Sequence, residues 1–221
     1  MADTDDSEER KLARFLRDRL TRIQTCNCDI ENKLRDEEHE YLKYWNGHVI
    51  DESDYSKAYN HIDLVVRQTF RYAMLVTVCS FVEDALVRIG KRSDANYNCD
   101  IKEIDSNGKM NCAKAHLDLL CKYCGLDATP IKSECESFRQ IVTLRNCVVH
   151  AWGNVAEDRN PDQVKEAVEH LVESGKEGNF DFVDISRDKC LHLGDNIIVH
   201  AILAAQSIID HIAKSLLGGR L

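Results

Sequence analysis

Residues 144–153 have the sequence LRNCVVHAWG and end a longer segment whose pattern decides the fold. From Ile131 onward, apolar side chains recur every three or four positions, which is the spacing of one buried face of an α-helix. Arg145 interrupts this face, because the positions one turn away on either side are apolar. A charge there is costly to bury unless it is paired or meets a partner surface. The predicted face comprises Ile131, Cys135, Phe138, Ile141, Val142, Leu144, Val148 and Trp152.

The same predicted helix end carries two further polar side chains. Asn146 and His150 are four residues apart, so they share one side of a helix. Gly153 follows as a helix stop signal. We therefore expect a guanidinium, an amide and an imidazole to come together at this helix end.

The composition favours helices and a single domain. The 221 residues include only two prolines and ten glycines, and no linker rich in glycine, proline or serine is evident. The net charge of −9 opposes sequence-independent adhesion to nucleic acid, so a nucleic-acid site would have to be a local basic cleft. The first residues lack the pattern of a secretory signal, and the longest apolar run, residues 73–82, is too short to cross a bilayer. We expect a cytoplasmic protein with reduced cysteines and no membrane partner.

The order of patterns predicts an all-α fold, a helical bundle with long antiparallel helices and a small β-hairpin before the last helix. Thr129-Pro130 and Asn160-Pro161 are helix start signals, whereas residues 180–193 alternate as a hairpin would. We expect one helical domain over residues 1–221, in which residues 1–52 extend a core of residues 53–221. The expected helices cover residues 8–45 with a break near residues 26–28, and residues 54–90, 110–123, 130–152, 161–175 and 196–217.

The motif Arg145-Asn146-x-x-x-His150, on a helix that ends at Gly153, resembles the signature of HEPN domains. The resemblance covers this motif and a helical layout from about residue 54 to residue 217. It implies metal-independent cleavage of RNA without a cofactor, in which a 2′-hydroxyl attacks the adjacent phosphorus. The resemblance assigns proton transfer to His150 and phosphate binding to Arg145, and it implies that Asn146 orients His150 or the phosphate.

The resemblance also implies a homodimer, because two copies of the motif face each other across a dimer in this family. That arrangement would place Arg145 at an interface and would supply two histidines to one composite site. The expected function is an endoribonuclease acting in defence, toxicity or RNA processing, with an inhibitory or regulatory protein partner. In a toxin branch of the family a modified tyrosine occupies the position of Trp152, so that modification is excluded here. The alternative is a non-catalytic HEPN-like dimerisation or adaptor module that binds a protein or a nucleotide.

Two acids in the preceding apolar helix are candidate supports for the motif. Glu83 and Asp84 interrupt the apolar segment of residues 62–89, and either is a candidate buried partner for Arg145. The alternative is that both are ordinary acids at a helix edge. Trp152 is the third expected support, because it lies two positions after His150.

Two other patterns compete with the motif. Arg187 and His192 have the same spacing as Arg145 and His150 but fall in the predicted hairpin, so we interpret this pair as coincidental. A second pattern contains one C-x-x-C pair with a nearby histidine, which is a weak zinc signal in a stretch where cysteine commonly serves as a small apolar residue. Its residues are Cys112, His116, Cys121 and Cys124.

Overall fold

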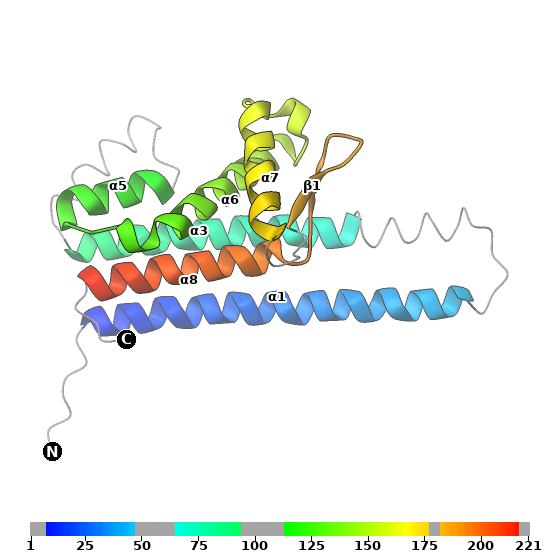
Figure 1. The fold of residues 1–221 in the computed structure, drawn as a ribbon. Coiled ribbons are helices and arrows are strands. Elements are labelled where there is room, and N and C mark those ends of the chain that lie inside the picture. Colours follow the sequence, from blue (N-terminus) through cyan, green and yellow to red (C-terminus); the bar gives the residue numbers. More distant parts are fainter. Residues whose placement is uncertain (1–7, 47–64, 94–112, 177–181, 217–221) are drawn as a thin grey trace, which may run out of the picture. The chain divides into compact units, whose positions relative to one another are not determined.

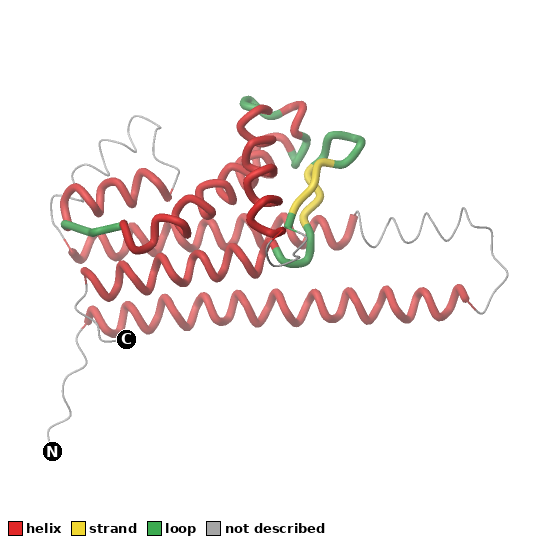
Figure 2. The backbone as a smooth tube through the Cα atoms, viewed as in Figure 1, coloured by secondary structure: helices red, strands yellow, loops and turns green. Residues whose placement is uncertain are grey.

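A computed structural model of the 221-residue chain describes residues 8–46, 65–93, 113–176 and 182–216. Within these ranges the chain forms six α-helices, two short 3-10 helices and one antiparallel pair of strands (Figures 1 and 2). The predicted all-α fold with a small hairpin before the last helix is confirmed. The elements are α1 (Glu8–Asn46), α3 (Gln68–Ser93), α5 (Ala113–Cys124), η2 (Thr129–Ile131), α6 (Lys132–Ala151), η3 (Val155–Glu157), α7 (Pro161–Lys176), β1 (Val183–Ile185), β2 (Leu191–Leu193) and α8 (Ile197–Leu216).

Helix α1 runs without interruption, so the predicted break near residues 26–28 is wrong (Figure 1). Asn27 is buried within this helix, whereas Cys26 and Cys28 on either side of it are exposed. Cysteine and asparagine cost a helix only a few tenths of a kcal/mol each, to about 0.7 at most, which tertiary packing readily overrides. Residues 54–64 of the second predicted helix lie outside the described residues.

The start of α6 differs from the predicted cap. Thr129 opens the 3-10 turn η2, with Pro130 in its first turn, and α6 itself begins at Lys132. The Thr129 backbone N–H donates to the carboxylate of Asp127, two residues earlier, at 2.9 Å. Hydrogen bonds from Thr129 lower the pKa of Asp127, since they favour the charged carboxylate.

The described chain divides into two compact units, and neither is a continuous segment. One unit contains Met1–Arg22, Thr77–Thr143 and His200–Leu221, and the other contains Ile23–Val76 and Leu144–Val199. Helices α1, α3, α6 and α8 contribute residues to both units.

The first unit is built around the apolar side of α8. Ile202, Ile208 and Ile212 are fully buried there, and His211 of the same helix bonds to the Asp127 carbonyl at 2.6 Å. By length and composition, α8 is the one described helix that could cross a membrane, and 56% of its apolar window is buried in the fold. Buried helices of water-soluble cores have the same composition, so this finding carries no further conclusion.

The second unit contains the hairpin and α7. Val183 pairs with Leu193 and Ile185 with Leu191 in an antiparallel register, and β1 contacts α7. The turn between the strands is closed by a hydrogen bond from the Ser186 N–H to the Cys190 carbonyl at 2.8 Å. Hairpin turns often need a residue with positive φ, and Lys189 supplies it here with φ 62° in place of a glycine.

Candidate functional site

The end of α6 brings Arg145 toward the side of the helix that carries His150. Residues five apart lie about 140° apart around an α-helix, so Arg145 and His150 start on different sides. Asn146, four residues before His150, shares its side. The Arg145 Nη1 donates to Asn146 Oδ1 at 3.0 Å, so the amide draws the guanidinium toward the histidine side. The role of Asn146 in the motif is therefore to orient the Arg145 side chain.

The three motif residues differ in exposure. Arg145 and Asn146 are half-buried, whereas His150 is exposed at the last turn of α6. Val149, next to His150, is also exposed although it is apolar. The predicted cluster is therefore open to solvent at its imidazole and partly enclosed at its guanidinium.

Trp152 does not lie on the buried face that its spacing predicted. Its side chain is 87% exposed, so the prediction that it is buried with the apolar stripe is wrong. Helix α6 ends at Ala151, and the next two residues have positive φ, 53° at Trp152 and 80° at Gly153. The Asn154 N–H donates to the Ala151 carbonyl at 2.8 Å and closes this turn. Helical periodicity stops applying once the chain turns, which is why the pattern misplaced the indole.

The turn that carries Trp152 is held by α3 and β2. The Leu191 N–H donates to the Gly153 carbonyl at 2.8 Å, and the Tyr72 hydroxyl donates to the Leu191 carbonyl at 2.6 Å. A Cβ at Gly153 would lie 2.7 Å from Tyr72 Cζ, so only glycine fits against this ring. Burial raises the pKa of Tyr72 to about 12, which keeps its hydroxyl protonated as a donor.

Cys147 lies within the motif but is not a nucleophile. Its side chain is buried, and burial, with a contribution from the nearby Asp158 carboxylate, raises the pKa of the thiol to about 12. A thiol of that pKa is almost wholly protonated at neutral pH, and the thiolate is the reactive form. The polar groups that remain at this helix end are the guanidinium, the amide and the imidazole.

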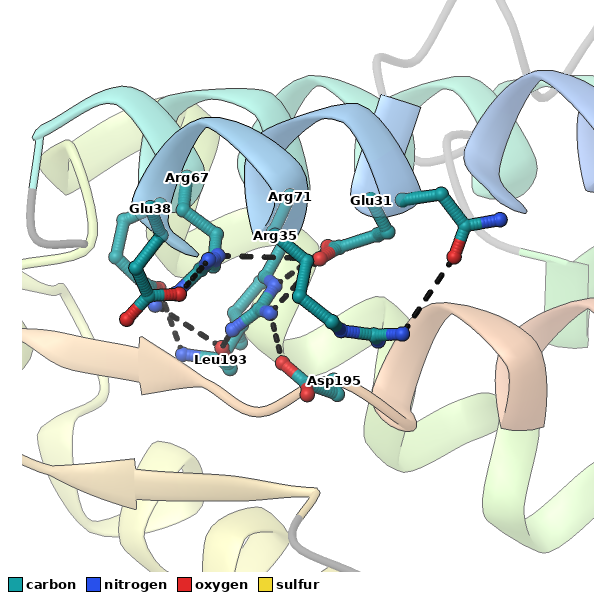
Figure 3. Close-up of polar contacts among 9 residues, drawn as sticks. Glu31, Arg35, Glu38, Arg67, Arg71, Leu193 and Asp195 are labelled. Atoms are coloured by element: carbon teal, nitrogen blue, oxygen red, sulfur yellow. Dashed lines mark hydrogen bonds and ion pairs between the residues drawn. The ribbon is translucent and has the colours of Figure 1, made fainter. Parts of the chain in front are cut away.

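Sequence reasoning missed the most buried charged side chain among the described residues of the second unit. Arg71 of α3 is 2% exposed, and its guanidinium binds Glu31 of α1 through Nε to Oε1 at 2.7 Å and Nη2 to Oε2 at 3.0 Å (Figure 3). Nη1 donates to the Leu193 carbonyl at 2.6 Å, and Nη2 also contacts the Asp195 carboxylate. These bonds occupy all three guanidinium nitrogens, so Arg71 joins α1, α3 and the end of β2.

Two neighbours of Arg71 extend this polar cluster. Arg67 Nη2 donates to Glu38 at 2.7 Å, and Gln68 exchanges two hydrogen bonds with the Leu193 backbone, at 3.0 and 2.8 Å. A signal existed in the sequence, because Arg67, Gln68 and Arg71 lie on one side of a helix just before its longest apolar run, residues 73–82. The pattern did not reveal their partners, which come from segments distant in the chain.

The end of α6 and the turn after it, residues 145–153, form the candidate site of this chain. Comparisons with protein-family models, curated proteins and solved structures find no match. Arg145, Asn146 and His150 supply its polar groups, and Trp152 is its exposed apolar neighbour.

An apolar pocket lies on the segments that follow the site. It has a volume of about 260 Å³, and the Val155 N–H, which donates to the Lys189 carbonyl at 2.8 Å, links two of the three segments that line it. Its walls combine small apolar side chains with two lysines. The lining residues are Val155, Ala156, Pro161, Lys165, Ile185 and Lys189.

The acids expected to support Arg145 belong to the first unit, whereas the motif belongs to the second. Asp84 binds Arg88 at 2.7 Å within α3, with both side chains about half exposed, as in an ordinary surface pair. Glu83 is half-buried.

The structure does not assemble a second site from either of the two competing patterns, the Arg187/His192 pair and the cysteine–histidine group, among the residues that it describes. Arg187 is exposed in the hairpin turn and His192 lies in β2, so this pair has no helix around it, as the hairpin prediction required. Of the weak zinc candidates, Cys112 lies outside the described residues, His116 is buried and Cys121 is exposed, with Cys124 half-buried. Among the residues that the structure describes, no three side chains of the metal-binding types converge.

Proposed function

We propose that this chain is a metal-independent endoribonuclease of the HEPN type, with its active site at a homodimer interface. The observation that carries the proposal is the 3.0 Å hydrogen bond from Arg145 to Asn146, one helical turn before the exposed His150. It holds a permanent cation toward the side of α6 that carries His150. A cation and a titratable ring are the groups that phosphoryl transfer from RNA requires.

The reaction is an in-line displacement at phosphorus. The RNA 2′-oxygen forms a bond to phosphorus while the bond from phosphorus to the 5′-oxygen breaks, which leaves a 2′,3′-cyclic phosphate and a 5′-hydroxyl. A neutral imidazole takes the 2′ proton, and an imidazolium returns a proton to the departing 5′-oxygen. The Arg145 guanidinium stabilises the negative charge that develops on the phosphoryl oxygens.

A second copy of the chain supplies the second imidazole. One His150 cannot reach both ends of the displaced bond, so two motifs must face each other across the substrate. The exposure of the apolar Val149 beside the motif supports this arrangement, because an exposed apolar group next to a polar centre is typical of interaction surfaces. Arg145, half-buried on an otherwise apolar face, then lies at the composite site.

The test is cleavage of a long unstructured RNA in excess chelator, with the end groups of the products identified. We expect cyclic phosphate ends, and a loss of rate of about 100- to 10,000-fold in His150→Ala, the range expected for a general acid or base. Arg145→Ala should lose activity similarly. Arg187→Ala is the matched control, since Arg187 has the same spacing to a histidine but is exposed in the hairpin turn. Cleavage that survives in both motif variants refutes the proposal.

The dimer requires a separate measurement. The rate per mole of chain should rise with protein concentration and level off where light scattering reports a dimer. A monomer that cleaves RNA at a rate independent of concentration contradicts the composite site. A dimer that cleaves no RNA supports the alternative, a non-catalytic adaptor module.

A further inference from the structure

Two residues of the described chain other than glycine have positive φ, and both lie beside the candidate site. They are Trp152 with φ 53° and Lys189 with φ 62°. The segments that carry them are joined by two backbone hydrogen bonds, from the Leu191 N–H to the Gly153 carbonyl and from the Val155 N–H to the Lys189 carbonyl. A side chain costs free energy in this conformation, and such strain tends to gather at functional positions.

Trp152 has the properties of a stacking platform. Its indole is 87% exposed, and its backbone is fixed between the end of α6 and the Tyr72–Leu191 contact. An aromatic side chain has only two χ angles, so it loses little conformational freedom when a planar ligand stacks on it. It also lies two residues from His150, so a base stacked on it belongs to a nucleotide near the scissile phosphate.

The apolar pocket provides a second place for a base, lined in part by residues that closely follow Trp152 in the chain. Val155, which lines it, is three residues from Trp152, so their Cα atoms are at most about 11 Å apart. Its volume of about 260 Å³ is enough for a heterocyclic base, and its small apolar side chains offer flat contact. Lys165 and Lys189 are also among its lining residues, and the Lys165 ammonium binds Asp162 at 2.9 Å.

We propose that Trp152 and this pocket are two base subsites for an unpaired RNA strand, a proposal that rests on the nuclease function proposed above. One base stacks on Trp152 and a neighbouring base enters the pocket, while the Lys189 ammonium binds the phosphate backbone between them. A paired strand cannot use this surface, because its bases are already stacked and hydrogen-bonded. The substrate class is therefore single-stranded RNA, such as a loop or an unpaired tail.

The test measures binding apart from cleavage. The probe is a short fluorescent single strand of 2′-fluoro RNA, which lacks the attacking hydroxyl, titrated into the full chain and followed by anisotropy. Trp152→Ala should weaken binding by about 5- to 150-fold, the range for loss of one stacked base, and Trp152→Phe should restore most of it. Tyr44→Ala is the matched control, because Tyr44 is an aromatic residue of α1 that is also exposed, at 60%. The same probe annealed to its complement should bind more weakly.

Two further variants address the pocket and the cation. Asparagine tolerates positive φ but carries no charge. Lys189→Asn should therefore lower the slope of log affinity against log salt concentration by about 0.7, which is the value for one phosphate contact on a single strand. Ala156→Phe should weaken binding by filling the pocket. An unchanged salt slope and unchanged affinity in these two variants overturn the pocket subsite.

The outcomes separate this proposal from the nuclease function. Wild-type cleavage with full probe affinity in Trp152→Ala overturns the base subsites and leaves the nuclease standing. Loss of probe affinity in Trp152→Ala, in a protein that cuts no RNA, supports the subsites and refutes the nuclease. A Trp152→Ala variant that changes oligomeric state but binds the probe normally also overturns the subsites, since Trp152 then belongs to a contact between copies.

Discussion

Replacing Arg71 with methionine should be among the most destabilising single changes in the second unit. The substitution keeps an unbranched side chain but deletes every hydrogen bond of a guanidinium that is 2% exposed. Glu31, which is itself buried, would lose both short contacts and keep only the Arg67 Nε at 3.9 Å. The Leu193 carbonyl would keep its bond from Gln68, and the Asp195 carboxylate is 61% exposed and can hydrate. The cost is therefore concentrated at Glu31.

Removing one partner of a buried ion pair costs about 3–5 kcal/mol, because the other charge stays buried without compensation. Against a usual total of about 5–15 kcal/mol, this is a large share of the stability of the fold. For a chain of this length it corresponds to a fall in Tm of roughly 6–20 °C. Changing both partners, in Arg71→Met with Glu31→Leu, removes the uncompensated charge and should recover much of the loss.

Urea unfolding followed by circular dichroism measures these differences, with the m-value checked for constancy. Arg139→Met is the matched control, because Arg139 pairs with Glu136 within α6 while its side chain is 50% exposed. Such a surface pair contributes about 1 kcal/mol or less. If Arg71→Met costs no more than Arg139→Met, or if Glu31→Leu worsens it additively, the assigned role of Arg71 is wrong.

Three further predictions concern other positions. In urea unfolding, Gly153→Ala should destabilise the fold by roughly 1–3 kcal/mol more than Gly125→Ala. Both glycines have positive φ, but of the two only Gly153 lies against Tyr72. Equal losses of stability would contradict the close approach of Gly153 to the Tyr72 ring. Burial lowers the pKa of His200, so the folded state resists protonation. The free energy of unfolding should thus fall as the pH drops below the unfolded value of about 6.5. His200→Gln should flatten that part of the profile, and an unchanged pH dependence would argue against this role. Thiol alkylation, mapped by mass spectrometry, should label the exposed Cys26 and Cys28 quickly. Cys147 should react only after unfolding, because burial raises its pKa to about 12. Rapid labelling of Cys147 in the native protein would refute this.

The sequence by itself determined the fold class and most element boundaries. Apolar side chains at helical spacing and strong start signals such as Asn160-Pro161 are local, so they predicted α7 and α8 to within two residues. The hairpin before α8 was also predicted by its alternation. The order of residues further showed that Arg145, Asn146 and His150 share a helix end, because that depends only on the geometry of one helix.

Tertiary structure decided what that helix end presents to solvent. Periodicity placed Trp152 in the core, but Gly153 against Tyr72 and the bond from Leu191 require a turn that directs the indole outward. The Arg71 cluster likewise joins residues 40 and 124 positions apart in the chain. Contacts between distant segments leave no periodic trace in one sequence, because each partner alone looks like an ordinary polar residue. The motif could therefore be predicted from sequence, whereas the exposed surface around it depends on how α3 and β2 pack against the end of α6.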